Sequence, residues 1–269
     1  MVERLVRNEK VRGSTPLTST KGAASRVSHF FPLASPMRHL FLSLLVLSGA
    51  FFPQTVRAQA KPLLWNTLTP AQQSVLNSGK PVVLEEEVPG NPWPRFTIYQ
   101  LVRATPAQVA AIFWDCEKDP EYIPNCTKVS VLSRPSPCVV EAEYTLKMPF
   151  LIPDEVYVSR NELQLSPDGS YGVSWKVLRS RYTKSCSGTL RLEGHEGGTL
   201  IRYSNLVEPG SRIAKLLKAS ASRQVVESVQ SLVDRVGELL VRPGNSLEKQ
   251  IRTLEEALGL TAGSRPAAK

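Results

Sequence analysis

The most constraining feature of this sequence is a series of alternating segments that precedes one long amphipathic helix. Between residues 126 and 207, five or six short segments alternate apolar and polar side chains and are separated by turn residues. In one of them Val140 and Tyr144 share a face, while Glu141 and Glu143 share the opposite face. Such segments are typical of strands with one dry and one wet side. The spacing predicts a single antiparallel meander.

The helix that follows carries an apolar stripe along residues 223–240. Its members recur at steps of three and four residues: Val225, Val229, Leu232, Val236 and Leu239. A long sheet with one apolar helix must curl around that helix to bury its dry face, and the grip leaves space for a ligand. We therefore predict an α+β fold of the helix-grip type. A curved antiparallel sheet of about six to seven strands should wrap around the long C-terminal helix and enclose a hydrophobic cavity.

Two shorter helices carry signals at their N-termini. Thr69 precedes Pro70, and Thr105 precedes Pro106 with Gln108 three residues after the threonine. Threonine is a good N-cap, proline fits the first helical position, and a glutamine at the third position completes a capping box. Helices are therefore expected to start at residues 70 and 106.

The first sixty residues end in a pattern typical of a secretory signal. Arg38 and His39 precede an apolar run, Leu40–Phe52, and Ala58-Gln59-Ala60 offers a small-x-small cleavage site. The run is shorter than the roughly 20 apolar residues that span a bilayer, although an uncleaved anchor is the alternative. We expect export, with cleavage near Ala60 and a bacterial periplasm as the destination.

A polar leader of 36 residues does not ordinarily precede such a signal. We expect the natural chain to start at Met37, with residues 1–36 assigned to it by mistake, and any natural peptide from before Met37 would contradict this. Eight of the 33 basic and two of the 24 acidic residues lie in the first sixty, so the net charge of the remainder falls from +9 to about +3. We find no basic cluster there, so no nucleic-acid partner is expected.

The predicted organisation has five parts. In order, these are the doubtful leader (1–36), the signal peptide (37–60), an N-terminal extension (61–92), the ligand-binding domain (93–241), and a helix with a disordered tail (242–269). Within the last part, Asn245 should cap a helix whose narrow stripe contains Leu247, Ile251, Leu254 and Leu258. This helix should either dock loosely or serve self-association, and the oligomeric state stays open.

Several kinds of chemistry are missing from the expected mature chain. Two of the three histidines, His29 and His39, lie in the segment to be removed, and His195 lies in a glycine-rich turn where it should be solvated. There is no C-x-x-C pair, phosphate-binding loop or dinucleotide fingerprint. We expect no cofactor, no metal and no catalytic residue set, and thus a binding protein rather than an enzyme.

Four stretches resemble the START-related superfamily (SRPBCC), which includes the polyketide cyclase-like and Bet v 1-like proteins. They are "ATPAQVAAIFWDCEKDPEYIPNCTKVSVL", "KMPFLIPDEVYVSR", "CSGTLRLEG" and "TLIRYSNLVEPGSRIAKLL". The resemblance extends from about Phe96 to Leu240. The family's Arg-Asp at one strand entry reads Asp154-Glu155 here, so that arginine's role is not carried over.

The resemblance implies a hydrophobic ligand between sheet and helix, such as a lipid, isoprenoid, quinone or sterol-like molecule. Transient contact with a membrane would fit such a carrier. Candidate wall residues are Tyr144, Tyr157, Val173, Trp175 and Tyr203, and candidate polar anchors are Arg160, Arg179 and Asn205. The alternatives are a cyclase- or aromatase-like enzyme on a polyketide-type substrate, which would need a buried acid or base, and a protein-interaction module based on the last helix.

The stretch "WDCEKDPEYIPNC" holds two cysteines ten residues apart. In an oxidising compartment a Cys116–Cys126 disulfide would close a tight corner, and free thiols are the alternative. Cys138 and Cys186 should be small buried residues. The charged residues of the stretch (Asp115, Glu117, Lys118, Asp119 and Glu121) should form a solvated rim, with a place at the cavity mouth as the minority interpretation.

Overall fold

The computed structural model describes residues 63–148, 152–210, 218–242 and 244–260. The expected leader, signal peptide and C-terminal tail lie outside these residues. The described elements run as follows: η1 (Leu64–Thr67), α1 (Pro70–Asn77), β1 (Val82–Glu86), β2 (Arg95–Val102), α2 (Pro106–Trp114), η2 (Cys116–Glu121), β3 (Cys126–Ser136), β4 (Val139–Leu146), β5 (Glu155–Leu165), β6 (Tyr171–Ser180), β7 (Thr183–His195), β8 (Gly198–Pro209), α4 (Lys218–Val241) and α5 (Ser246–Ala257).

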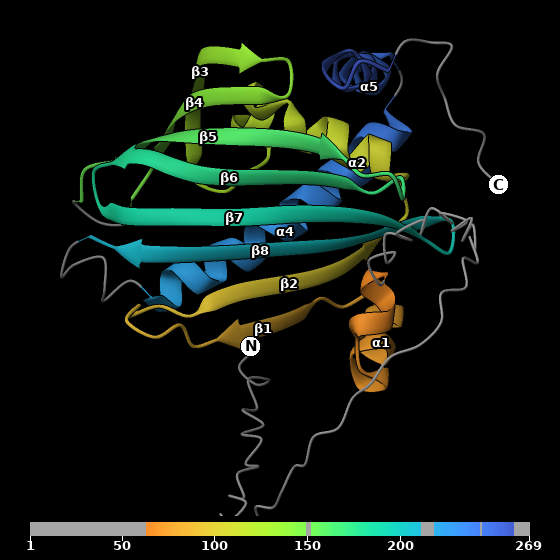
Figure 1. The fold of residues 1–269 in the computed structure, drawn as a ribbon, viewed down its shortest axis with the longest axis horizontal. Coiled ribbons are helices and arrows are strands. Elements are labelled where there is room, and N and C mark those ends of the chain that lie inside the picture. Colours follow the sequence, from red (N-terminus) through yellow and green to blue (C-terminus); the bar gives the residue numbers. More distant parts are fainter. Residues whose placement is uncertain (1–62, 149–151, 211–217, 243, 261–269) are drawn as a thin grey trace, which may run out of the picture. The chain divides into compact units, whose positions relative to one another are not determined.

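The strands form one curved antiparallel sheet with the order β1-β2-β8-β7-β6-β5-β4-β3 (Figure 1). From β3 to β8 the chain is a meander, as the alternating segments predicted. β2 then pairs with β8, which places the first and last strands of the predicted domain side by side. The alternation in β4 has the predicted parity, because Val140, Ala142 and Tyr144 are buried and the glutamates between them are not.

Helix α4 crosses one face of the sheet, with α2 on the same side (Figure 1). Four members of its predicted stripe (Val229, Leu232, Val236 and Leu239) are buried, which confirms the helix-grip arrangement. Within the residues that the structure describes, no helix combines the length and the hydropathy needed to span a bilayer.

The predicted capping box at Thr105 is present, and Thr69, which was predicted only as an N-cap, forms a second one. The backbone N–H of Gln72 donates to Thr69 Oγ1 at 3.3 Å, and the N–H of Thr69 donates to Gln72 Oε1 at 2.8 Å. Thr105 and Gln108 repeat this arrangement with the same two distances. Each box satisfies backbone donors that have no partner inside the helix, so α1 and α2 start where the sequence predicted.

The N-terminal extension belongs to the sheet. β1 pairs with β2 and adds an eighth strand to the predicted six or seven. η1 and α1 bring Leu64, Leu68 and Leu76 against Tyr99 and Leu200, which lie on the sheet face opposite the helix grip. This second small core explains why the extension folds with the domain.

The same core corrects the expectation for His195. Its ring stacks on Trp65 with the centroids 4.0 Å apart. The neighbouring Glu193 is buried, and its carboxylate accepts a hydrogen bond from the Leu64 N–H at 2.6 Å. The histidine therefore packs against the extension at the end of β7 and is not a solvated turn residue.

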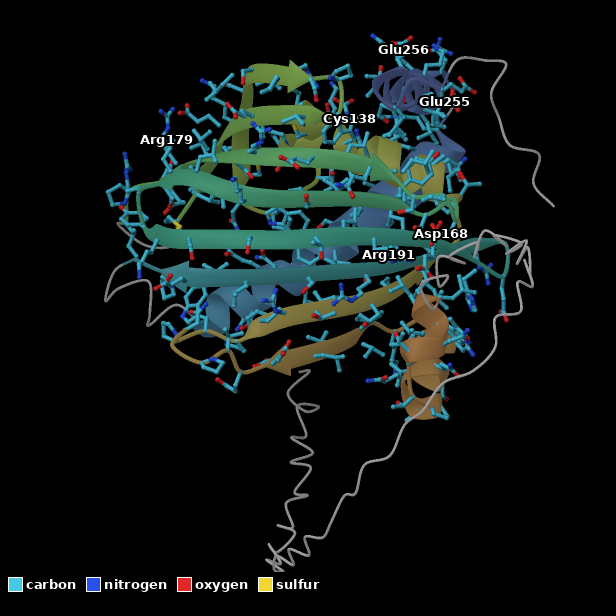
Figure 2. The ribbon with its side chains drawn as sticks, viewed as in Figure 1. Cys138, Asp168, Arg179, Arg191, Glu255 and Glu256 are labelled. Carbon is cyan, nitrogen blue, oxygen red and sulfur yellow. The ribbon has the colours of Figure 1, made fainter. Side chains whose placement is uncertain are left out.

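Helix α5 packs on α2 more closely than its narrow stripe suggested. Leu254 is fully buried, and Gln250 Nε2 donates to Asp115 Oδ2 at 2.9 Å. The thiol of Cys138, labelled beside α5 in Figure 2, contacts the Ala257 carbonyl oxygen at 3.0 Å. Asn245 does precede the helix, although its side chain makes no capping hydrogen bond.

Substitution of Leu254 tests the docking of α5. Leu254→Ala should lower the free energy of unfolding by about 2–4 kcal/mol, because it leaves a cavity in a packed contact. Arg252→Ala, on the exposed side of the same helix, should change it by less than about 0.5 kcal/mol. Urea unfolding followed by circular dichroism measures both variants. Equal small effects would show that α5 is not docked in solution.

Candidate ligand-binding cavity

A cavity of about 340 Å³ lies between the gripping face of the sheet and the helices α2, η2 and α4. The sheet contributes Val140, Tyr144, Tyr157, Val173, Trp175 and Tyr203 to its wall. The helices contribute Phe113, Trp114, Val225, Val229 and Leu232. The wall is therefore mostly aromatic and aliphatic, with a small number of polar groups, as is typical of small-molecule sites.

Six of the eight predicted ligand-contact residues line this cavity. They are Tyr144, Tyr157, Val173, Trp175, Tyr203 and Asn205. They come from β4, β5, β6 and β8, and their shared orientation follows from the period of two along each strand. Whether they contact a ligand remains a prediction.

The two predicted arginine anchors do not line the cavity. Arg160 lies on the outer face and pairs with Glu141 at 3.1 Å and Glu162 at 2.8 Å. Arg160 is flanked by Ser159 and Asn161, which both face the cavity, so strand parity turns the arginine outward.

Arg179 is turned outward by a β-bulge. Trp175 and Val177 face the cavity, and simple alternation would put Arg179 on the same side. The register instead passes from Ser159 opposite Val177 to Val158 opposite Arg179, which leaves an extra residue in β6. The bulge reverses the parity beyond it, and Arg179 pairs with Glu143 at 3.5 Å on the outer side of the sheet (Figure 2).

The aromatic wall residues hold one another in place. The rings of Tyr144 and Tyr157 stack with centroids 5.0 Å apart and an interplanar angle of 3°. Trp175 packs against Tyr203 at 5.0 Å and Phe113 at 6.0 Å. Such contacts add to the burial energy of each ring, so this wall is largely preformed.

Gly188 on β7 makes room for the indole of Trp175. A Cβ atom at this position would overlap the Trp175 ring and would lie 2.6 Å from the Ser204 carbonyl oxygen. Trp175 Nε1 then donates to Asn205 Oδ1 at 3.2 Å. The glycine of the "CSGTLRLEG" stretch thus has a packing role beside the cavity.

Three phenols of the wall, those of Tyr144, Tyr157 and Tyr203, stay protonated. Burial raises the pKa of Tyr144 and Tyr157 well above the usual value, and it raises the pKa of Tyr203 as well. Desolvation is the main cause in each case, because it penalises the phenolate. The wall therefore presents neutral hydroxyl groups at any physiological pH.

Glu155 lines the cavity, but its carboxylate is hydrogen-bonded to the β6–β7 turn. It accepts hydrogen bonds from Ser180 Oγ at 2.6 Å, the Arg181 N–H at 3.0 Å and the Tyr182 N–H at 3.1 Å. Glu155, which stands where the family has the second residue of its Arg-Asp pair, thus holds the β6–β7 turn in place beside the cavity.

Asp119 is a polar residue of the site that the main sequence interpretation placed elsewhere, although the minority interpretation put it at the cavity mouth. It was expected on a solvated rim, yet it lines the cavity, and Tyr122 Oη donates to its Oδ1 at 2.9 Å. Desolvation raises the pKa of Asp119 to about 8, the charge of Asp115 adds to the rise, and the Tyr122 hydrogen bond opposes it. Near neutral pH this carboxyl is mostly protonated.

The helical period of η2 explains the error. In a 3₁₀-helix, side chains three residues apart eclipse one another, and Cys116 and Asp119 of that series face the cavity while Tyr122 packs beside them. The positions between them, Glu117, Lys118 and Glu121, are exposed, as a rim requires. The spacing of three residues between Cys116, Asp119 and Tyr122 in "CEKDPEY" was the sequence signal that could have placed Asp119 on the cavity side.

Of the two alternatives for Cys116 and Cys126, a disulfide or free thiols, the structure has the free thiols. Both residues are free, both are buried, and both face the cavity. Burial raises the pKa of each thiol to about 12, so each behaves as a small apolar wall group. Cys138 and Cys186 are only partly buried, whereas full burial was expected.

The described residues contain no group of three or more histidine, cysteine or acidic side chains placed to hold a metal ion. Three of the cavity's acidic and thiol groups, Asp119, Glu155 and Cys186, are hydrogen-bonded to protein partners. The arrangement can enclose an apolar molecule and offer it neutral hydroxyls, amides and one carboxyl group.

No protein-family model and no curated protein matches the sequence. Solved structures do match it. The STAR-related lipid transfer protein (fragment 25–204) from Xanthomonas axonopodis is 15% identical with a TM-score of 0.53, over 58% of this chain and 93% of that one. Human STARD10 is 11% identical with a TM-score of 0.56, over 68% and 78%. The Zhui aromatase/cyclase from Streptomyces sp. R1128 is 13% identical with a TM-score of 0.49, over 56% and 97%.

The protonated state of Asp119 can be tested through stability. The unfolded chain loses this proton near the usual pKa of 3.8, and the folded chain keeps it to about pH 8. The wild-type free energy of unfolding should therefore fall between these two pH values. The asparagine side chain cannot ionise, so the Asp119→Asn variant does not lose stability in this way. The difference in the free energy of unfolding between Asp119→Asn and the wild type should therefore grow by on the order of 2–5 kcal/mol from pH 4 to pH 8.

Chemical denaturation across this pH range measures the effect. Glu117→Gln, an exposed neighbour in η2, is the matched control and should show no such growth. An Asp119→Asn advantage that is the same at pH 4 and pH 8 would contradict the desolvated, protonated carboxyl.

Proposed function

We propose that this chain, which has the START-related helix-grip fold, is a carrier or binding protein for a hydrophobic ligand held between the sheet and α4. The observation that carries the proposal is the cavity of about 340 Å³ lined mainly by aromatic and aliphatic side chains. Ligand pockets ordinarily measure about 300–1,000 Å³. Tyr144, Tyr157, Val173, Trp175 and Tyr203 are the proposed contacts with the apolar part of the ligand.

The size of the cavity sets a scale for affinity. A ligand that buries about 300 Å² of apolar surface gains roughly 7 kcal/mol from desolvation. Part of this free energy offsets the translational and rotational entropy that the ligand loses on binding. Because the wall is preformed, little further entropy is lost by ordering its side chains. Affinities around the micromolar range are the natural expectation for a carrier that must also release its ligand.

The similarity to a lipid transfer protein supports a ligand of the lipid class. Lipid, isoprenoid, quinone and sterol-like molecules all fit an apolar wall of this kind. An exported location remains part of the proposal, and it is based on the signal pattern in residues 37–60. Transient contact with a membrane would let such a carrier load and unload.

A cyclase- or aromatase-like enzyme is the second candidate function, and Asp119 is the observation that favours it. A carboxyl group that keeps its proton near pH 7 could act as a general acid toward a carbonyl oxygen. Conversion of a poly-carbonyl substrate by the wild type, with loss of turnover in Asp119→Asn, would establish the enzyme. Binding of the poly-carbonyl substrate without its conversion would favour the carrier proposal instead.

The third alternative, an interaction module based on the last helix, has lost part of its support. The stripe that suggested it packs inside the molecule, with Leu254 fully buried and Leu247, Ile251 and Leu258 packed against the main core. The helix therefore has an internal role that accounts for its apolar residues.

A cavity-filling substitution tests the carrier proposal. Ser228 lines the cavity from α4, so Ser228→Trp should occupy much of the space and weaken binding of the neutral fluorophore Nile red by about tenfold or more. Gln230→Trp, exposed on the same helix, should bind Nile red like the wild type. Fluorescence titration measures both, and circular dichroism checks that each variant is folded. Equal binding by the two variants would place the dye outside the cavity and contradict the proposal.

A further inference from the structure

The cavity wall contains no cationic side chain among the described residues. Its ionisable groups are Asp119, Glu155, three cysteines and four tyrosines, without lysine, arginine or histidine. The two arginines whose charges reach η2 lie outside the lining and are paired: Arg235 with Glu121 and Glu238, and Arg134 with Glu117. An anionic group inside the cavity would therefore find no opposite charge in this wall.

Asp119 is the one acidic side chain of the described wall that has capacity for a ligand. Three protein donors already occupy the Glu155 carboxylate. In the described part of the chain, the Asp119 side chain has a single hydrogen-bond partner, Tyr122, which uses Oδ1. The second oxygen, Oδ2, is left for a group inside the cavity.

The surroundings of Asp119 favour a neutral partner. Cys116 and Cys126 flank it as un-ionised thiols, and Tyr144 is a neutral phenol whose oxygen accepts a hydrogen bond from Asn161 Nδ2 at 3.2 Å. A protonated carboxyl can donate through its O–H and accept through its other oxygen. A ligand hydroxyl or ketone can complete that pattern, whereas a carboxylate or phosphate would find no cation in the described wall to offset its desolvation.

Resting on the proposed function, we infer that Asp119 determines ligand specificity: the cavity selects a neutral amphiphile with a hydroxyl or ketone group, held at Asp119 Oδ2, over a carboxylate or phosphate of the same chain length. The apolar body of the ligand then lies along the Tyr144, Tyr157 and Trp175 side of the wall. The class comprises long-chain or polycyclic alcohols and ketones, including quinone-type carbonyls. Free fatty acids and anionic lipid head groups are excluded from the cavity.

The test compares ligands that differ only at the polar end. Dodecan-1-ol, dodecan-2-one, dodecanoate and dodecyl phosphate compete with Nile red for the purified chain at pH 6. The alcohol and the ketone should bind at least about tenfold more tightly than either anion, the difference expected when a buried charge lacks a partner. An anion that binds as tightly as the alcohol would overturn the inference.

Two variants assign the preference to Asp119. Asp119→Ala should weaken dodecan-1-ol by about tenfold and leave the hydrocarbon fluorophore 1,6-diphenyl-1,3,5-hexatriene within about twofold, because only the alcohol has a polar group that needs the contact. Asp119→Asn, which keeps a donor and an acceptor, should retain the alcohol within about threefold. Glu117→Ala, on the exposed side of η2, is the control and should match the wild type. Alcohol binding that is unchanged in Asp119→Ala would remove Asp119 from the site.

The outcomes also separate this inference from the proposed function. If Nile red binds in the cavity but the anions compete as well as the alcohol, the carrier proposal stands and the specificity inference is wrong. If neither Nile red nor any of the four dodecyl compounds binds, the carrier proposal is wrong and the inference is overturned with it.

Discussion

The structure depends on a mismatch between the apolar face of the sheet and the helix that covers it. Eight strands about 4.8 Å apart make a sheet roughly 34 Å wide, and the 24-residue helix α4 is about 36 Å long but only about 10 Å across. One helix can therefore bury a diagonal band of the face and no more. Curvature, α2 and η2 cover part of the remainder, and the part of the face that no helix packs against directly lines the cavity. The site is thus a consequence of how the sheet is buried.

The chemistry of the cavity follows from the same burial. Side chains that line a partly enclosed apolar space lose hydration, and desolvation keeps phenols, thiols and the carboxyl of Asp119 in their neutral forms. Charged groups that the sequence offered as anchors, Arg160 and Arg179, pair with glutamates on the outer face instead. The result is a wall that can form hydrogen bonds but carries little charge, which suits an apolar ligand with a neutral polar group.

Much of the fold could be predicted from the sequence, because its signals are local and periodic. The capping residues Thr69 and Thr105 fix two helix starts through hydrogen bonds within four residues. The parity of β4 and the stripe of α4 follow from periods of two and about 3.6. The same period of two puts Val173 and Trp175 on one face of their strand, where both line the cavity, without any knowledge of long-range contacts.

The errors lie where a local pattern changes or where a long-range contact decides. A bulge in β6 reverses the face of Arg179, and a 3₁₀ turn gives Asp119 a period of three that was read as an irregular corner. The place of α5 depends on contacts with α2, far from it in the sequence. No spacing rule could show that Cys116 and Cys126 would both be turned into a cavity as free thiols.

The most direct test of the central claim is a native mass spectrum of the full chain, purified gently from an expressing cell, beside an analysis of its organic extract. The account predicts a discrete adduct that leaves on denaturation and reappears in the extract as a neutral lipid, alcohol or quinone-type molecule. The bare mass of the chain, with no uptake from a mixed pool of neutral lipids and quinones, would contradict a ligand-holding cavity.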